Sequence, residues 1–174
     1  MDYTIRPVEP GDAPGIPALR RMPGVFENTL GLPSCRTADS AAFLASLGPN
    51  DHNFVAAAED GTIIAAAGLQ VCSNPRMRHV GSIGLFVHTD YQNQGVGTAL
   101  MKAILDLADN WLMLVRVELE VFADNERAIR LYEKFGFEKE GLLRMTTVRC
   151  GQYADEYKMA RLRPAVGYAV KPSV

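Results

Sequence analysis

The alternation of apolar and polar residues predicts most of the strands. Residues 115–122 alternate valine and leucine with arginine and glutamate, which is typical of a strand with one buried face. Residues 3–8 alternate in a similar way. An Asp60-Gly61 turn between two apolar segments predicts a hairpin, and Cys150-Gly151 predicts another. The expected strands are residues 3–8, 54–58, 62–71, 80–87, 115–122, 138–148 and 153–161.

Apolar residues at helical spacing predict helices between these strands. From Val96 to Trp111, apolar residues recur every three or four positions. A later helix ends at Gly136, where glycine is a typical C-terminal cap. Two earlier helices are expected, one capped by Asp12 and the other by Thr37.

The resulting order is strand, two helices, three strands, helix, strand, helix and two strands. This order indicates a mixed α/β domain rather than a regular repeat of strand-helix-strand units. The 174 residues have the size of one domain with a sizeable core. We expect this domain over residues 1–163. Residues 164–174 lack periodicity and are expected to form a disordered tail or an interface arm.

Composition excludes several classes of partner. The net charge of −2, with interspersed charges, provides no surface for nucleic acid. No apolar run is long enough to span a membrane, and the first residues do not resemble a signal peptide. Cys35, Cys72 and Cys150 fit neither a disulfide framework nor a zinc pattern. We therefore expect a cytoplasmic protein without a metal.

The segment from Gln92 to Thr98 is the strongest candidate for a binding site. It joins a strand to a helix and contains Gly95 and Gly97. Glycines leave backbone amides open at a helix start, where the helix dipole favours anions. This favours a main-chain cradle for a pyrophosphate, although two glycines also permit tight packing of strand against helix. A dinucleotide-binding site is disfavoured because Leu100 occupies the position of the third glycine. A P-loop is disfavoured because its lysine and hydroxyl pair does not follow the glycines.

Two elements of the chain resemble a known family. Gln92, Gly95 and Gly97 resemble the Q/R-x-x-G-x-G/A signature of the GCN5-related N-acetyltransferases (GNAT), and the expected order of elements matches this family. The family's second element is represented by Asn125, Ala128, Tyr132, Gly136 and Phe137. The resemblance implies an α/β fold with a mixed, mostly antiparallel sheet of about seven strands. That sheet is splayed between strands four and five and flanked by four helices.

One branch, the bacterial L-amino-acid N-acetyltransferases, is similar over further segments. These are residues 26–30, 109–112, 118–119, 121–122, 124–125, 140–141 and 151–155. The resemblance implies acetyl-CoA as donor, a small-molecule primary amine as acceptor and direct attack by the amine. It also implies a homodimer, since many relatives pair. The residues implied in cofactor binding are Leu85, Phe86, Val87, Gln92, Asn93, Gln94, Gly95, Val96, Gly97, Thr98, Asn125 and Tyr132.

The catalytic roles follow from the same resemblance. Tyr132 matches the tyrosine of the second element and is the expected general acid. Its helical spacing also allows an ordinary core position. For the general base, Glu118, Glu120 and His79 are candidates, and a structural role is open for each. Asn125 is also a good helix N-cap, which is compatible with cofactor binding.

The acceptor pocket is the least defined part. Asn28 and Thr29 in an early loop, with Tyr153 and Asp155 in the last hairpin, are candidates to line it. An arginine is the natural partner of an amino-acid carboxylate, and Arg20, Arg21 and Arg144 are equal candidates on sequence alone.

The leading hypothesis is acetylation of the α-amine of a free L-amino acid. Within the same chemistry, the acceptor alternatives are a protein N-terminus or lysine, a polyamine, and an amine-bearing antibiotic or herbicide. A non-catalytic acetyl-CoA-binding module and a nucleotide-binding module are the alternatives from other classes.

Overall fold

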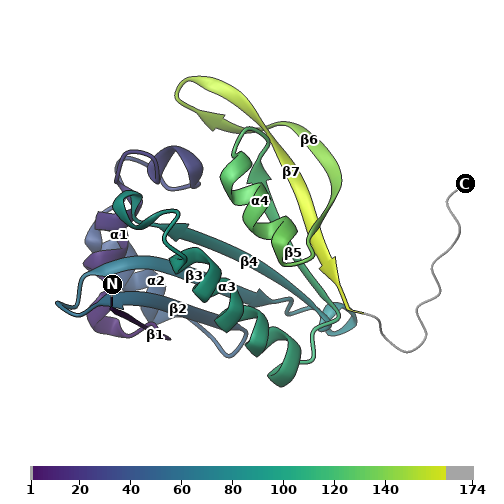
Figure 1. Cartoon of the computed structure of the whole chain (residues 1–174), viewed down its shortest axis with the longest axis horizontal. Coiled ribbons are helices and arrows are strands. Elements are labelled where there is room, and N and C mark those ends of the chain that lie inside the picture. The colour runs from purple at the N-terminus through teal and green to yellow at the C-terminus, as the bar shows by residue number, and fades with distance from the viewer. Residues whose placement is uncertain (1, 164–174) are drawn as a thin grey trace, which may run out of the picture.

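A seven-stranded sheet in the order β1-β2-β3-β4-β5-β7-β6 runs through the protein (Figure 1). The computed structural model describes residues 2–163, so the tail predicted over residues 164–174 lies outside the described residues. The strands are β1 Tyr3–Pro7, β2 Asp51–Ala58, β3 Ile63–Val71, β4 Val80–Val87, β5 Arg116–Phe122, β6 Glu138–Arg149 and β7 Gln152–Leu162. The helices are α1 Gly15–Arg20, α2 Thr37–Ser46, α3 Val96–Asp106 and α4 Glu126–Lys134.

The sheet divides where β4 meets β5. Every other neighbouring pair is antiparallel, whereas β4 and β5 are parallel and pair only from Val80 opposite Arg116 to Ser82 opposite Glu118. Beyond Ser82 the two strands separate. The mixed α/β sheet, with its splay between strands four and five, therefore confirms the fold predicted from the sequence.

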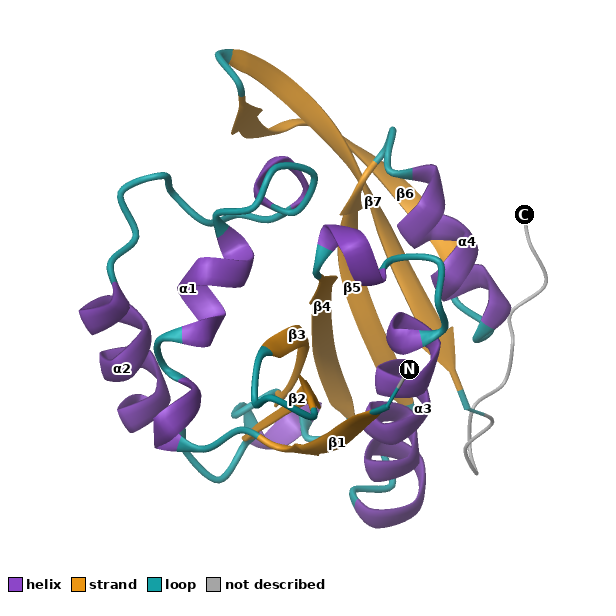
Figure 2. Ribbon diagram, turned by 60° about the vertical axis from the view of Figure 1, so that its left-hand side comes forward, coloured by secondary structure: helices purple, strands orange, loops and turns teal. Residues whose placement is uncertain are grey.

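The helices cover opposite faces of this sheet: α1 and α2 lie on one face, and α3 and α4 on the other (Figure 2). Strand alternation produces both cores. Ala65 and Ala67 of β3 pack in the cluster that includes Leu100 of α3. Ala66, between them, packs with Leu19 of α1. The split between β4 and β5 thus opens between two differently covered faces.

Three local predictions were wrong. Thr37 does not cap the second helix, because α2 begins at Thr37 itself and its N-cap is Arg36. Asp12 does not cap the first helix, because its carboxylate accepts two hydrogen bonds from Arg6 at 2.8 and 2.7 Å and α1 begins only after Pro14. The helix from Val96 does not keep its apolar face through Trp111. A π-helical turn over Leu107–Trp111 changes the phase of the side chains, and Trp111 is 77% exposed.

Among residues 2–163, no helix is long and apolar enough to cross a membrane. The same residues contain no group of three or more His, Cys, Asp or Glu side chains arranged to hold a metal ion.

Candidate active site

A cavity of about 840 Å³ occupies the split between β4 and β5. Its walls come from both faces of the sheet: α1 and the loop after it on one side, and the start of α3 and the inner face of α4 on the other. The far wall is formed by β5 and β7. A single molecule can therefore contact residues of both faces through the split.

The edge of β4 that faces the split carries free amides. The His88 N–H donates to the Ile64 carbonyl at 2.8 Å, and the Cys72 N–H donates to the Val80 carbonyl at 2.9 Å. Because bonded and non-bonded positions alternate along an antiparallel pair, the N–H groups of Leu85 and Val87 point away from β3. No β5 residue pairs with them beyond Ser82. Both N–H groups are therefore available to a ligand in the split.

The loop from Gln92 to Gly95 brings further amides to the same cavity. Asn93 and Gly95 have left-handed backbones, with φ of 59° and 89°. The helical hydrogen bonds of α3 begin with the Ala99 N–H donating to the Gly95 carbonyl at 2.9 Å. The N–H groups of Val96, Gly97 and Thr98 therefore have no intrahelical acceptor, and they point out of the positive end of the helix.

Two glutamine side chains hold this loop in shape. Gln92 Nε2 donates to the Val87 carbonyl at 2.9 Å, and Gln94 Nε2 donates to the Asp90 carbonyl at 2.5 Å. The first bond ties the loop to the end of β4. At Gly97, a Cβ atom would lie 3.3 Å from Leu131 Cδ2, so glycine lets α3 approach α4 closely. Side chains thus stabilise the loop while its amides stay free.

Most of the predicted cofactor residues border the cavity. The lining includes Leu85, Phe86, Val87, Gln92, Asn93, Gly95, Gly97, Thr98, Asn125 and Tyr132. Gln94 and Val96 do not line it, and Val96 is 1% exposed in the core. Asn125 is the N-cap of α4, because its side chain accepts a hydrogen bond from the Ala128 N–H at 3.2 Å.

Tyr132 lies in α4 at the wall of the split. It is 5% exposed, and burial raises the pKa of its phenol to about 12. Its ring is 5.9 Å from that of Phe137, the aromatic residue at the end of the second sequence element. Tyr132 also borders the cavity, so its phenol is protonated at neutral pH and accessible to a bound molecule.

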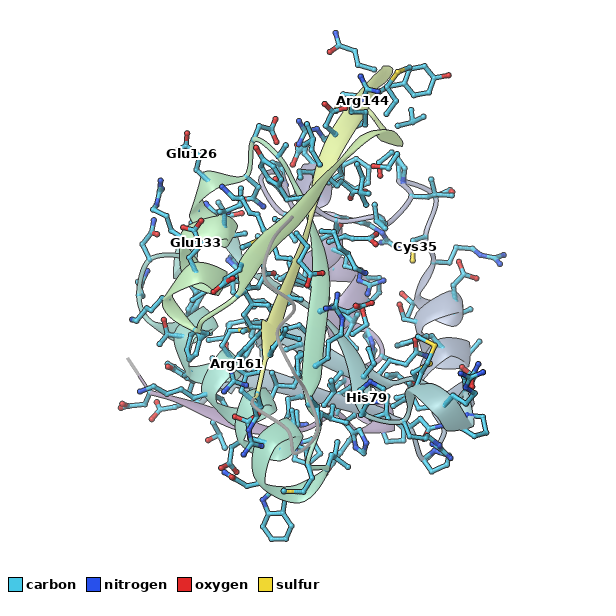
Figure 3. All side chains as sticks on the ribbon, turned by 90° about the vertical axis from the view of Figure 1, so that its right-hand side faces the viewer. Cys35, His79, Glu126, Glu133, Arg144 and Arg161 are labelled. Carbon is cyan, nitrogen blue, oxygen red and sulfur yellow. The ribbon has the colours of Figure 1, made fainter. Side chains whose placement is uncertain are left out.

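Of the candidate bases, Glu118 and His79 lie outside the cavity lining, whereas Glu120 borders it. Glu118 forms ion pairs with Arg116 at 2.7 Å and Lys158 at 2.9 Å. Desolvation alone would raise the pKa of Glu118, but hydrogen bonds from Lys158 and Arg116 keep this pKa below its ordinary value. His79 is exposed just before β4, toward the far end of the molecule from Arg144 (Figure 3).

The predicted acceptor residues separate into two pairs. Asn28 and Thr29 border the cavity, at the end of a short helical turn over Phe26–Asn28. Tyr153 and Asp155 do not. Tyr153 is 67% exposed in the β6–β7 hairpin, and Asp155 accepts a hydrogen bond from the Met145 N–H at 2.9 Å, within that hairpin.

Three charged side chains lie on the α1 face of the cavity: Glu120 of β5, and Glu156 and Lys158 of β7. Glu120 was a candidate base in the sequence, whereas Glu156 and Lys158 were not among the predicted site residues. Glu156 is 5% exposed, and Thr146 and Thr147 donate their hydroxyl protons to its Oε2 at 2.8 and 3.0 Å. Alternation on β5 places Glu120 opposite the core face, but nothing in the local sequence of β7 distinguishes Glu156 from neighbouring Asp155.

The three candidate arginines also differ in position. Arg20 borders the cavity, and its Cζ lies 4.9 Å from the centre of the Phe86 ring. Arg21 donates a hydrogen bond to the Cys35 carbonyl. Arg144 is exposed on the projecting part of the β6–β7 hairpin (Figure 3). Arg20 alone of the three borders the cavity.

Comparison with known proteins identifies the family. Residues 25–137 match the acetyltransferase (GNAT) family. The chain is 33% identical to the L-amino acid N-acetyltransferase AaaT of Escherichia coli, over 93% of this chain and 99% of that protein. It is also 35% identical to the N-alpha-acetyltransferase RimI of Mycobacterium tuberculosis, over 70% of this chain and 73% of that protein.

Solved structures have the same fold. A GNAT-family acetyltransferase from Streptococcus pneumoniae superposes with a TM-score of 0.79 and 26% identity, over 92% of this chain and 99% of that one. The spermidine N-acetyltransferase of Vibrio cholerae, solved with CoA and spermine, has a TM-score of 0.81 and 22% identity, over 92% and 95%. The chain belongs to the GNAT family and is an acetyl-CoA-dependent N-acetyltransferase.

Proposed function

We propose that this enzyme acetylates the α-amine of a free L-amino acid within a ternary complex with acetyl-CoA. The observation that carries the proposal is the continuous cavity through the split, with free amides on one side and charged side chains on the other. The similarity to the E. coli L-amino acid N-acetyltransferase over nearly the whole chain supports the choice of acceptor.

Main-chain groups are proposed to hold the donor. The pyrophosphate of acetyl-CoA is an anion and fits the amides at the start of α3. The pantetheine arm carries amide groups that fit the free edge of β4, as an added strand would. The Val87 N–H is then close to the thioester carbonyl, where it would polarise the C=O bond and stabilise the oxyanion.

The reaction is proposed as one displacement without an acyl-enzyme. The neutral amine attacks the thioester carbon, the C–N bond forms, and the tetrahedral intermediate collapses with cleavage of the C–S bond. Tyr132 would protonate the departing thiolate, a role supported by its place on the cavity wall and by its match to the tyrosine of the second sequence element. Much of the rate would come from holding both substrates in position.

Removal of a proton from the incoming ammonium needs a second group. The sequence candidates Glu118 and His79 stay untested, and their distance from the cavity lining gives them little support. We infer that Glu156 takes this role. It is buried, it borders the cavity, and two threonine hydroxyls rather than a cation accompany its carboxylate, so it is able to attract a substrate ammonium.

The test is a steady-state panel with acetyl-CoA, following release of the free thiol. The acceptors are the twenty common L-amino acids, their primary amides, spermidine, and a short peptide with a free N-terminus. The proposal expects the highest kcat/KM for one or more free amino acids. A higher value for spermidine or the peptide would reject it in favour of the polyamine or protein alternatives.

We also propose a cytoplasmic location and a homodimer. Cys35, Cys72 and Cys150 are all free thiols, which fits a reducing compartment. Sedimentation equilibrium of the purified protein would test the dimer, and a single species with the mass of one chain would reject it.

A further inference from the structure

Arg20 lies at the cavity without an anionic partner. Its Nε atom is buried and has no hydrogen-bond acceptor within the described residues. Burial lowers the pKa of this guanidinium, and no described carboxylate counteracts the shift. A half-buried guanidinium whose Nε has no acceptor is unfavourable for folding. Such a group is expected where a ligand supplies the missing charge.

The other cations around the cavity are either paired or exposed to solvent. Lys158 pairs with Glu118 and Glu120, and Arg130 pairs with Glu126. Arg127 and Lys134 are exposed residues of α4, on the opposite face of the sheet from Arg20.

The acidic groups of the lining have partners as well. Asp51 accepts hydrogen bonds from the Gly48 N–H and the Gln70 side chain, both within β2–β3 and the turn before them. Glu120 pairs with Lys158, and Glu156 with two threonines. Arg20 is therefore the half-buried cation of the described lining that is free to receive an anion from the substrate.

The position of Arg20 is fixed close to the reacting atoms. It is the last residue of α1, and its guanidinium stacks over Phe86 with Cζ 4.9 Å from the ring centre. Phe86 directly precedes Val87, whose N–H faces the split, and consecutive Cα atoms are about 3.8 Å apart. An anion on Arg20 is thus held beside the proposed site of the thioester carbonyl.

We propose that Arg20 binds the carboxylate of the acceptor and so restricts the enzyme to amines that carry a carboxylate next to the amino group. A guanidinium presents a planar pair of N–H donors that matches a carboxylate. In an α-amino acid the amine is two bonds from the carboxylate carbon, so this anchor directs the amine toward the thioester. A polyamine offers only positive charge to Arg20. This inference rests on the proposed function.

The test is the Arg20→Met variant, measured with the best amino acid of the panel and with its primary amide, at saturating acetyl-CoA. The amide keeps the amine and the side chain but lacks the charge that Arg20 would bind. For the amino acid, KM is expected to rise about 10- to 100-fold in the variant, which is the effect of losing a charge-assisted hydrogen-bonded pair. For the amide, KM is expected to change less than about twofold.

Arg21→Met is the matched control, because Arg21 is the next residue and donates to a main-chain carbonyl instead. It should preserve the preference for the acid over the amide. Arg20→Lys keeps the charge but loses the planar donor pair, so it should give an intermediate KM. Melting temperatures with and without acetyl-CoA establish that each variant folds.

The outcomes separate the two proposals. If the wild type prefers the acid over the amide and Arg20→Met keeps that preference, the role of Arg20 is rejected and the proposed function stands. If the wild type acetylates neither amino acids nor their amides, both are rejected. If Arg20→Met fails to fold, an inhibition experiment with the wild-type enzyme tests the inference instead. The matching carboxylic acid without its amine should compete with the amino acid, and an absence of competition would reject the inference.

Discussion

The two sides of the cavity present different chemical groups: main-chain amides on one side and side chains on the other. The proposed donor side, from the end of β4 to the start of α3, offers main-chain amides made available by Gly95 and the break in strand pairing. The proposed acceptor side offers side chains: Arg20 from α1, Asn28 from the following loop and Glu156 from β7. A main-chain site binds what every reaction of the family shares. A side-chain site is able to change with the substrate while the fold stays constant.

The two sides also place different requirements on the sequence of this chain. The donor side needs a left-handed backbone at Gly95 and close packing at Gly97, and both requirements limit the residues allowed. The acceptor side needs a charge at a point in space, which any of several elements can supply. Four substitutions test this contrast.

The largest effect is expected at the junction of the two sides. Tyr132→Phe keeps the ring but removes the proton proposed for the leaving thiolate, so kcat should fall about 10²- to 10⁴-fold. The KM for acetyl-CoA should stay nearly constant. Tyr157→Phe is the control, because Tyr157 is a partly buried tyrosine of β7 outside the cavity lining. Equal kcat for Tyr132→Phe and wild type would remove the acid role.

On the acceptor side, Glu156→Gln should lower kcat/KM for the amino acid about 100-fold at neutral pH, because the amide cannot accept the ammonium proton. Glu118→Gln is the matched carboxylate outside the lining and should lower it less than about threefold. The measurement is kcat/KM from pH 6 to 9. A larger loss in Glu118→Gln would return the base role to the residue predicted from sequence.

On the donor side, Gly95→Ala should raise the KM for acetyl-CoA about tenfold, because the left-handed backbone is disfavoured with a Cβ and the amides shift. Gly61→Ala is matched in strain, since Gly61 has φ of 84° and equally open surroundings in the β2–β3 turn. Both variants should lose about 1 kcal/mol of stability. A similar KM for acetyl-CoA in the two variants would show that the geometry of this loop does not contribute to acetyl-CoA binding.

The smallest effect is expected at the closed end of the split. The folded pKa of Glu118 lies below its ordinary value of 4.5, so its ion pairs contribute stability above that pH. This contribution is lost as pH falls through the folded pKa. Glu118→Gln should therefore be less stable than wild type by about 1 kcal/mol at pH 7, and the difference should disappear once the pH is below the folded pKa of Glu118. Urea unfolding at pH 7 and below that pKa measures this, and a constant difference would contradict it.

Much of the fold was predictable, because strand alternation and turn residues are local signals. Residues 80–87 were predicted as the strand that forms β4, and the order of elements and the split were confirmed. The wrong predictions were at Asp12, where a contact with Arg6 replaces the cap, at Thr37, where Arg36 is the cap instead, and at Trp111, where a π-helical turn changes the phase. Neither the Arg6 contact nor the π-helical turn has a local sequence signal.

The acceptor side was less predictable for a related reason. Arg20 was one of three equal candidates in sequence, and only burial at the cavity distinguishes it from Arg21. Glu156 is brought to the cavity by the pairing of β5 with β7, a contact between distant segments. Residues that meet only through tertiary structure have no characteristic spacing.

The most direct test of the two-sided cavity is to measure both Michaelis constants, for acetyl-CoA and for the amino acid, in Gly95→Ala and in Arg20→Met. The expected result is that Gly95→Ala raises the constant for acetyl-CoA alone and Arg20→Met raises the constant for the amino acid alone. A parallel rise of both constants in either variant would contradict a cavity with separate donor and acceptor sides.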